Sequence, residues 1–374
     1  MRVDGSVLVV GAGIGGLALA RALSLRGVEC VVVEKRPSTN TLGMGLNLPG
    51  NAVRALTHLG VVDEAVAHGV PINRREYRNG KGRLLFATDD LGFWRGVGTP
   101  LCIRHGYLLE ALRTPPTAAV RHDVRAVSAL ANDGQVEVRM VGMPTTTFDF
   151  VVGADGVHSA MRSALNGHDS AARGSAMTSS SWRFVVRNPG VDCWTVWSGA
   201  EATFLLIPVG NGEVYGYAAS TRGGTTGTEP NWLSIAFAGF AEPVTTVIAT
   251  LLSGAGQLHR SLVEEVRIST WHRGRMVLIG DAAHATGPVW AQGAAMAMED
   301  ALVLADVLAR QEDWSTVGET FERLRRARVD HVQATTDKMS RLARLPTWLR
   351  DAGAWLLGPR AYREAYETLR FDPL

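Results

Sequence analysis

The chain has 374 residues, a length that suits two interleaved domains better than one average domain. Hydrophobic residues make up 46% of it and charged residues 20%, which is typical of a soluble globular protein. The net charge of +2 gives no reason to expect a nucleic acid or an anionic membrane as a partner, so neither kind of binding protein is favoured.

Cysteine usage and hydropathy indicate the cellular compartment of the protein. Cys30, Cys102 and Cys193 lie far apart and form no C-x-x-C pair, so they predict neither a disulfide framework nor a metal site. The histidines show no metal-ligand spacing either. No window holds ~18 uninterrupted apolar residues, so we expect no transmembrane helix. Together these features favour a cytoplasmic protein.

The chain opens on a pattern that binds dinucleotides. Residues 7–10, VLVV, predict a buried strand, and residues 11–16, GAGIGG, fit G-x-G-x-x-G. In this pattern Gly11 allows the tight turn, Gly13 lets the backbone approach a pyrophosphate, and Gly16 lets a helix pack closely on the strand.

A predicted helix over 15–26 and a predicted strand over 28–34 complete the unit. The helix would aim its N-terminal amides and its dipole at the phosphates. Glu34 ends the strand roughly 20 residues beyond the last glycine, where an acid accepts hydrogen bonds from a ribose. Strand, helix, strand and acid in this order predict a dinucleotide site, although they do not separate FAD from NAD.

The following elements divide into two groups by composition. Up to residue 153 helices and strands are mixed, whereas 175–220 is rich in β-branched and aromatic residues with turn signals, which favours an inserted antiparallel sheet. The predicted elements are a helix over 51–59, a hairpin over 75–86, a helix over 106–113, β structure over 120–140, a buried strand over 148–153, helical structure over 230–258, a strand over 266–279 and helices from Ala294 onward.

Two later runs resemble cofactor-binding motifs. DFVVGADGVHSAMRSAL, over 149–165, is a strand that ends in a turn containing Asp155. VLIGDAAHATGPVWAQGAA, over 277–295, is a strand that ends at Gly280 and Asp281, followed by a loop and a helix. With the opening run they resemble, in order and approximate spacing, the FAD-dependent aromatic hydroxylases, the p-hydroxybenzoate hydroxylase-like (class A) flavoprotein monooxygenases.

The resemblance extends from about residue 5 to 311 and implies an α/β fold. We expect a Rossmann-like FAD-binding domain with an inserted antiparallel-sheet substrate domain and C-terminal helices. The expected division is an FAD-binding domain over 1–73, 101–174 and 266–345, a substrate-binding sheet domain over 74–100 and 175–265, and a C-terminal helical extension over 346–374.

The resemblance also implies which residues hold FAD. Asp281 would bind the ribityl chain, the loop over 288–295 would wrap the isoalloxazine ring, and the helix starting near Ala294 would aim its positive end at flavin O2. Arg104 would reach FAD near its phosphates. The whole expected set is Gly11, Gly13, Ile14, Gly15, Gly16, Glu34, Lys35 beside the adenosine, Arg104, Val127 over the adenine, Asp155, Gly280, Asp281, Pro288, Gly293 and Ala294.

Some of these assignments carry an alternative. Asp155 either contacts the cofactor or braces its own turn. His284 looks like a general base, but its place in the motif favours a role in bracing the loop. Ala291 stands where the family usually has a glycine, which makes close backbone approach to the flavin harder.

The substrate should lie between the flavin and the inserted sheet. Asn47 and Trp290 are the weak candidates for contact with the reacting ring, and Asn47 could instead be a loop amide that bonds its own backbone. No residue is assigned as a catalytic acid or base. The expected substrate-binding residues are Asn47, Arg183, Trp197, Phe204, Tyr217 and Trp290, of which the four on the sheet could equally belong to the core.

Two other groups of residues are expected to be structural. The arginines over 323–328 share a predicted helix with Glu319 and Glu322, which favours a solvated, ion-paired face. The late aromatic residues are expected to pack rather than to bind a ligand; they are Trp348, Trp355, Tyr362 and Tyr366.

The reaction implied by the resemblance is hydroxylation of an aromatic, heteroaromatic or polycyclic small molecule. NADH or NADPH would reduce FAD, and O2 would add to form a C4a-hydroperoxide that transfers one oxygen atom. A reductase or epoxidase of the same fold and a non-catalytic dinucleotide-binding protein are the alternatives. A flavin halogenase is disfavoured because its W-x-W-x-I-P signature is absent. Substrate identity and oligomeric state stay open.

Overall fold

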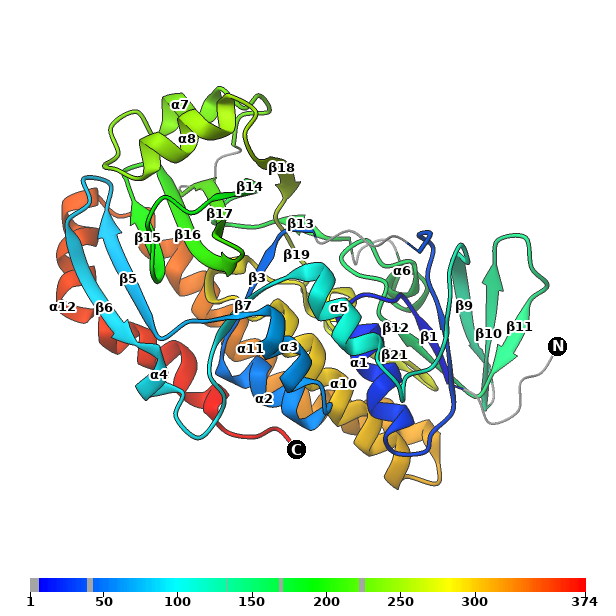
Figure 1. The fold of residues 1–374 in the computed structure, drawn as a ribbon. Helices are drawn as coiled ribbons and strands as arrows, with labels where there is room; N and C mark the ends of the chain where they lie inside the picture. Colours follow the sequence, from blue (N-terminus) through cyan, green and yellow to red (C-terminus); the bar gives the residue numbers. More distant parts are fainter. Residues whose placement is uncertain (1–6, 39–42, 133, 168–170, 222–225) are drawn as a thin grey trace.

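The computed structural model describes residues 7–38, 43–132, 134–167, 171–221 and 226–374. A six-stranded sheet has the strand order β20-β21-β12-β1-β2-β8, and its strands β1, β12 and β21 are labelled right of centre in Figure 1. Its strands are β1 (Val7–Val10), β2 (Cys30–Val33), β8 (Val120–Arg121), β12 (Phe150–Gly153), β20 (His272–Arg273) and β21 (Met276–Leu278).

The three sequence motifs belong to neighbouring strands of this sheet. Strand β1 pairs in parallel with β2 on one side and with β12 on the other, and β21 pairs in parallel with β12. Parallel strands that are buried on both faces are nearly all apolar, as VLVV in β1 is. The strand expected over 266–279 is shorter than predicted, because a turn at Gly274 separates β20 from β21 and reverses the chain.

Helices cover this sheet. Helix α1 (Ile14–Ser24) follows β1 and lies beside α10 (Gly293–Arg310), and both bury apolar residues in the main core. The other helices of this part are α2 (Gly50–His58), α3 (Val62–His68), α5 (His105–Arg113), α6 (Ala160–Asn166) and α9 (Asp281–His284). The helices predicted over 51–59 and 106–113 are therefore present, with ends that differ by one residue.

A second, seven-stranded sheet has the order β18-β14-β17-β16-β15-β5-β6. Its neighbours are antiparallel except for β5 and β15, which are parallel. The hairpin predicted over 75–86 is present as β5 and β6. The strands are β5 (Arg74–Asn79), β6 (Leu84–Asp89), β14 (Ser180–Arg187), β15 (Trp194–Ser198), β16 (Ala202–Gly210), β17 (Glu213–Ser220) and β18 (Gln257–Leu262).

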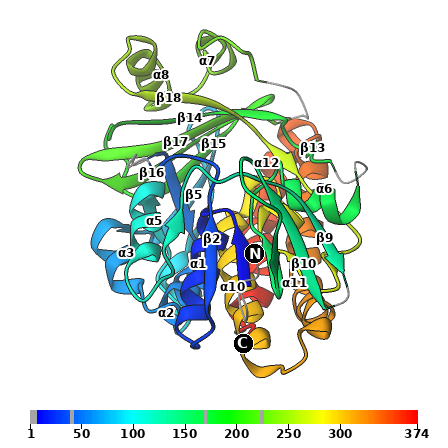
Figure 2. The ribbon, with the colours of Figure 1, turned by 90° about the vertical axis from the view of Figure 1, so that its right-hand side faces the viewer.

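The outer face of the seven-stranded sheet is covered by two short helices. Figure 2 shows α7 (Trp232–Ala236) and α8 (Val244–Leu252) on the side of this sheet that faces away from the six-stranded sheet. They close a separate apolar core with residues of β14, β16 and β17. The helical structure predicted over 230–258 is therefore interrupted: Pro243, which has no backbone N–H, stands before α8.

Smaller elements connect the two parts. Strand β3 (Gly45–Leu48), which sequence analysis treated as a loop, pairs with β7 (Leu101–Arg104), and β7 also pairs with β4 (Val70–Pro71). A three-stranded sheet and a strand pair complete the fold. They consist of β9 (Ala126–Asn132), β10 (Gln135–Met140) and β11 (Thr146–Phe148), and of β13 (Arg173–Gly174) and β19 (Glu264–Glu265).

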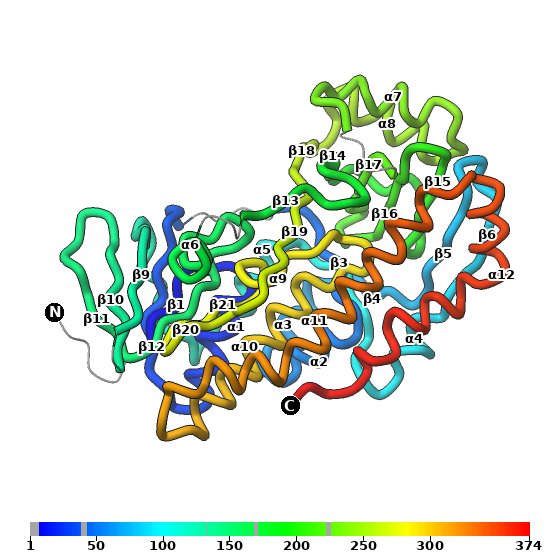
Figure 3. The backbone as a smooth tube through the Cα atoms, turned by 180° about the vertical axis from the view of Figure 1, so that it is seen from behind, coloured from blue at the N-terminus to red at the C-terminus, as the bar shows by residue number. Residues whose placement is uncertain are grey.

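The last two helices run across the back of the molecule. In Figure 3, α11 (Val317–Leu342) runs from the six-stranded sheet to the seven-stranded sheet, and α12 (Thr347–Tyr366) returns along β6. A Cβ atom at Gly358 would collide with the Phe86 ring, which shows how closely α12 packs on the sheet edge together with α4 (Asp90–Phe93). Among the helices of the described part, none combines the length and apolarity needed to cross a bilayer.

Candidate flavin and substrate site

The opening glycines have different surroundings. Gly11 has a φ of +107°, and a Cβ atom there would overlap the carbonyl oxygen of Ala154. A Cβ atom at Gly16 would overlap the carbonyl oxygen of Gly11. At Gly13, by contrast, no described residue other than its two chain neighbours has an atom within 4 Å of the Cβ position. Gly13 is also the N-cap of α1 and has no side chain to cap the helix amides, so the helix end is open to an anionic ligand.

Glu34 closes the opening turn onto β2. Its Oε2 accepts a hydrogen bond of 2.9 Å from the N–H of Ala12, and its Oε1 accepts one of 2.9 Å from the N–H of Arg36. Lys35 is exposed next to it, and Val127 lies half-buried in β9. The expected contacts of these side chains with ribose, adenosine and adenine stay predictions.

The hydrogen bonds of Asp155 stabilise the turn that contains it. Its carboxylate accepts from the hydroxyl of Ser159 at 2.5 Å and from the N–H of Ala160 at 2.7 Å, at the start of α6. From the same helix, Arg162 donates to the carbonyl of Ala282 at 3.1 Å, so the second motif is tied to the third. These protein groups satisfy the hydrogen-bonding capacity of the carboxylate without a cofactor. A contact of Asp155 with FAD stays a prediction.

A buried carboxylate that sequence analysis missed shapes the third motif. Asp300 of α10 accepts from the N–H of Gly280 at 2.9 Å, lies 2.6 Å from Nε2 of His284, and accepts from Nε of Arg325 at 2.8 Å. Burial raises the pKa of Asp300, but His284 and Arg325 outweigh it and hold the pKa at about 2. His284 is thus engaged in bracing the loop, in agreement with its expected structural role.

Arg325 corrects the expectation of a solvated arginine face on α11. Its side chain is fully buried between Glu299 and Asp300, whereas Arg323 is exposed. The sequence signal for this difference was present, because Phe321, Arg325 and Val329 recur at helical spacing on the buried face.

Asp281 is the first residue of α9, directly after Gly280 of the third motif. Its side chain is exposed, yet surrounding protein desolvates the carboxyl and raises its pKa, while His284 and Arg183 lower it. Oδ1 of Asp281 lies 3.9 Å from the Cβ position of Gly293. An exposed carboxylate that is partly desolvated by the surrounding protein fits a ligand that brings hydroxyl groups, such as the ribityl chain.

The two ends of the chain meet at α10. A Cβ atom at Gly15 would lie 3.4 Å from Cβ of Ala297, and one at Gly280 would lie 3.0 Å from the same atom. The open turn at Gly13 and the carboxylate of Asp281 are therefore presented together, and these residues fit a flavin dinucleotide.

The loop before α10 has one residue in an uncommon conformation. Residues Pro288–Trp290 form a single turn of 3-10 helix, and Ala291 follows at φ +54° and ψ +35°, in the left-handed region that favours glycine. Gln292 is buried and accepts a hydrogen bond of 3.0 Å from the side chain of Asn51. Gly293 and Ala294 are half-buried at the start of α10.

The seven-stranded sheet divides the predicted substrate residues between its two faces. Trp197 and Phe204 point into the core under α7 and α8, so the expectation that they face the flavin is wrong. Arg183 and Tyr217 are directly opposite each other on β14 and β17 and belong to the other face. The charge of Arg183 lowers the pKa of Asp281, so we expect this face to lie toward the flavin site.

Asn47 lies on strand β3 beside this face. The ring of Tyr215, which precedes Tyr217 by two residues and shares its face, covers Gly45, where a Cβ atom would lie 2.5 Å from Cβ of Tyr215. Oδ1 of Asn47 is buried and has no hydrogen-bond partner among the described residues, so the alternative of a self-bonded loop amide does not hold. Nε of Arg183 and Nε1 of Trp290 are likewise buried without a described partner.

Arg104 is engaged by protein groups. It donates to the carbonyl of Gly43 at 2.8 Å, to Oε2 of Glu213 at 2.8 Å and to Oε1 of Gln257 at 3.3 Å. It therefore connects β7 to the turn and strand ends of the seven-stranded sheet. Its expected contact with FAD stays a prediction.

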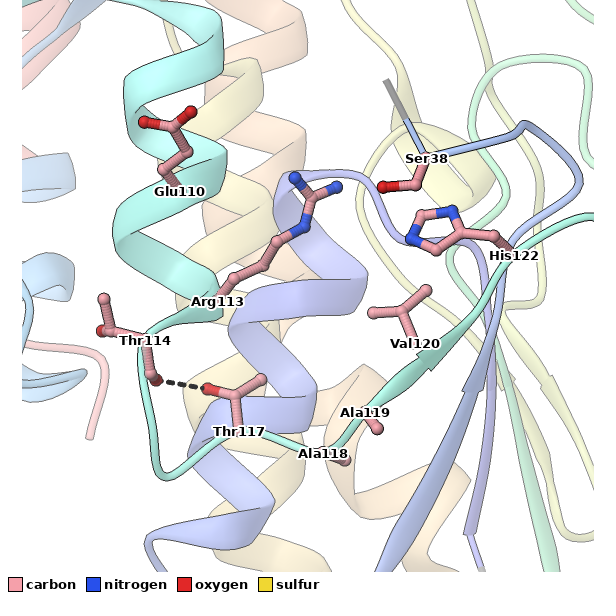
Figure 4. Close-up of a pocket in the computed structure, with 9 residues that line it drawn as sticks. All are labelled: Ser38, Glu110, Arg113, Thr114, Thr117, Ala118, Ala119, Val120 and His122. Carbon is pink, nitrogen blue, oxygen red and sulfur yellow. Dashed lines mark hydrogen bonds between the residues drawn. The ribbon is translucent and has the colours of Figure 1, made fainter. Parts of the chain in front are cut away.

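A cavity of about 710 Å³ adjoins the segment after Glu34. Figure 4 shows Arg113 of α5 pointing into it, with Ser38 and His122 on the opposite wall. His122 Nδ1 lies 3.1 Å from the carbonyl oxygen of Arg36, so the cavity borders the adenosine side of the predicted site.

Comparison with known proteins agrees with this geometry. A family model described as an FAD binding domain matches residues 4–338. The chain is 31% identical to the 2-heptyl-3-hydroxy-4(1H)-quinolone synthase of Pseudomonas aeruginosa over 97% of each chain. It is 30% identical to 3-hydroxybenzoate 6-hydroxylase 1 of Aquipseudomonas alcaligenes, covering 88% of this chain and 86% of that one.

A solved structure extends the likeness to the whole fold. Klebsiella pneumoniae HpxO in complex with FAD and uric acid superposes with a TM-score of 0.83 at 27% identity, covering 99% of this chain and 94% of that chain. The p-hydroxybenzoate hydroxylase-like fold, FAD as cofactor and monooxygenase activity are thereby confirmed. The chain belongs to the family of FAD-dependent aromatic hydroxylases.

Proposed function

We propose that the protein hydroxylates an aromatic or heteroaromatic ring that carries an anionic oxygen, held between the flavin and the inner face of the seven-stranded sheet. The observation that carries this proposal is the pair formed by Arg183 and Tyr217. They are cross-strand neighbours, and Nε of Arg183 is buried without a hydrogen-bond partner among the described residues.

A half-buried guanidinium whose buried Nε has no partner among the described residues favours an anionic ligand. Leaving such a donor unsatisfied costs free energy, whereas a phenolate or carboxylate would accept a charge-assisted hydrogen bond from it. An ionised oxygen on the ring also makes the ring richer in electrons, which suits attack by an electrophilic oxygen donor. Arg183 would therefore both select and activate the substrate.

Tyr217 is suited to donate a hydrogen bond rather than to accept a proton. Burial raises the pKa of Tyr217, and the nearby charge of Arg183 lowers it by less. Its hydroxyl therefore stays protonated at neutral pH. Beside Arg183 it would donate to the same oxygen of the ring and fix the orientation of the substrate.

Asn47 and Trp290 would complete the binding site. Oδ1 of Asn47 and the indole N–H of Trp290 have no partner among the residues that the structure describes; the first is an acceptor that suits a ring N–H or hydroxyl, and the second is a donor. Both atoms are buried, so a substrate that satisfied them would gain affinity and orientation together.

FAD, reduced by NADH or NADPH and reacting with O2, supplies the oxygen chemistry. The protein supplies the residues that would bind and orient FAD. The open helix end at Gly13 would take the pyrophosphate, and Asp281 would take the ribityl hydroxyls. The buried face with Arg183 would exclude water from the reacting ring.

The relatives support this substrate class. Those that match include a 3-hydroxybenzoate 6-hydroxylase and an FAD-dependent urate hydroxylase, which act on rings with ionisable oxygens. Charge on the ring is thus the shared feature that Arg183 would recognise. We also infer a cytoplasmic location and make no assignment of oligomeric state.

The test is a screen of small phenols, hydroxybenzoates and hydroxyquinolones for substrate-stimulated oxidation of NADH or NADPH, with the product mass measured. Gain of one oxygen atom is the expected result, and a product formed equally well without O2 would indicate a reductase instead. With the best substrate, Arg183→Met should raise KM by roughly ten- to a hundredfold, the loss of one charged hydrogen bond.

Arg187→Met is the matched control. Arg187 lies four residues further along β14, on the same face but exposed at the strand end. The Arg187→Met substitution removes the same charge outside the proposed site, so KM should stay within about twofold of the wild-type value. Equal effects of the two substitutions would refute the role of Arg183.

A further inference from the structure

The loop that precedes α10 is held from behind by the last helix. The hydroxyl of Tyr366, at the end of α12, donates a hydrogen bond of 2.8 Å to the carbonyl oxygen of Trp290. The two rings also meet edge to face, with centroids 5.6 Å apart and planes at 85°. Tyr366 is fully buried, so this contact is shielded from water.

Tyr366 is itself fixed by a buried ion pair. Nη1 of Arg75 donates to the Tyr366 hydroxyl at 3.3 Å, and Nε of Arg75 donates to Asp90 at 2.6 Å. The guanidinium of Arg75 also lies over the rings of Trp194, Tyr362 and Tyr366, each between 5.3 and 5.6 Å from the centroid. Arg75 belongs to β5, so the cluster joins the edge of the substrate sheet to the loop.

A second phenol of the same cluster has a different partner. Tyr362 donates to Asp90 at 3.0 Å and accepts from Nε1 of Trp94 at 3.2 Å. Its ring lies 4.8 Å from that of Tyr366. The two tyrosines are thus alike in burial and in contact with the ion pair, but only Tyr366 reaches the loop.

We propose that Tyr366 is a positioning residue for the flavin: by holding the carbonyl of Trp290, it fixes the loop over 288–294 at the isoalloxazine ring. The inference rests on the proposed placement of this loop beside the flavin.

The loop has particular need of such support. Ala291, the residue after Trp290, adopts a left-handed conformation that an alanine does not favour. The carbonyl of Trp290 belongs to the peptide unit that leads into this residue, so a hydrogen bond to it restrains the loop next to the unfavourable conformation. The same bond fixes the backbone of Trp290 and with it the indole, whose N–H has no partner within the described ranges and can meet a ligand.

The test compares Tyr366→Phe with Tyr362→Phe. Each variant keeps its ring and loses one buried hydroxyl, so both are expected to fold and to lose similar thermal stability. Only Tyr366→Phe should raise the dissociation constant of FAD, by about three- to tenfold, as expected for one hydrogen bond. Only Tyr366→Phe should shift the visible absorption spectrum of the bound flavin, and hydrogen exchange should increase in the loop peptide of that variant alone.

The proposal is wrong if Tyr366→Phe binds FAD with wild-type affinity and spectrum, or if Tyr362→Phe changes both to the same extent. The titration contains no aromatic substrate. A negative result would therefore leave the proposed hydroxylation untouched, and failure of the substrate screen would leave this comparison interpretable.

Discussion

Two glycines of the opening motif should respond in opposite ways to the same substitution. Gly13→Ala places a methyl group where no described residue other than its two chain neighbours has an atom within 4 Å, at φ −78° and ψ −171°, a conformation that alanine adopts freely. The folded protein should accept it, apart from up to about 1 kcal/mol for a poorer helix N-cap. Gly16→Ala places the methyl group on the carbonyl oxygen of Gly11, so the turn must move.

The expected magnitudes follow from these surroundings. In Gly13→Ala the methyl group stands between the helix amides and the pyrophosphate, and loss of one charged hydrogen bond costs ~1.5–3 kcal/mol. The dissociation constant of FAD should therefore rise roughly ten- to a hundredfold. In Gly16→Ala the forced shift should reduce the free energy of unfolding of the apoprotein by about 1–3 kcal/mol or more.

The assay separates binding from folding. FAD is removed, the apoprotein is unfolded in urea, and FAD is titrated back while flavin fluorescence is followed. Gly13→Ala should unfold near the wild-type urea concentration and bind FAD weakly. The reasoning is refuted if Gly13→Ala retains wild-type affinity, or if it is destabilised as strongly as Gly16→Ala.

Three further substitutions probe the rest of the site. Phe204→Ala should lower the free energy of unfolding by about 3–5 kcal/mol and leave the KM of the folded enzyme unchanged, since the ring packs under α7 and α8; a raised KM would contradict this placement. Ala291→Gly should raise the thermal midpoint, because glycine relieves about 1 kcal/mol of left-handed strain; a lower midpoint would count against it. Asp300→Asn should remove about 2 kcal/mol of pH-dependent stability, because the pKa of about 2 lies below that of the unfolded chain. That contribution is complete above about pH 4 and is lost as the pH falls toward 2, so urea unfolding of variant and wild type should converge in acid.

Local patterns were sufficient to predict the cofactor-binding framework. VLVV followed by GAGIGG specifies a strand, a turn and a helix through contacts within a few residues, and the structure has β1 and α1 there. The parallel pairing of β12 with both β1 and β21 follows from three apolar strands that end in glycine-containing turns. Family resemblance then supplied the cofactor that the glycines alone could not.

Contacts between distant segments could not be predicted in this way. Asp300 lies in a helix whose sequence is that of an ordinary amphipathic helix. Its structural role depends on hydrogen bonds with Gly280, His284 and Arg325, which are distant in the sequence. The expectation of packing for the late aromatic residues was half right for the same reason. Tyr362 and Tyr366 are buried, with Arg75 of β5 over both rings, whereas Trp348 and Trp355 remain 73% and 60% exposed.

The substrate residues show where a periodic pattern stops being informative. Sequence analysis expected Arg183, Trp197, Phe204 and Tyr217 on the same side of the sheet, but apolar residues are buried on both of its faces, one of which lies under α7 and α8. Apolar Trp197 and Phe204 therefore look as suitable for a binding site as Arg183 and Tyr217 do. What distinguishes the two faces is a polar group without a partner: a core face contains few of them, so the buried Nε of Arg183, which has no partner among the described residues, marks the face that we expect a ligand to complete. An arginine among the apolar residues of a strand is for this reason a better guide to the substrate side than an aromatic residue at the same spacing.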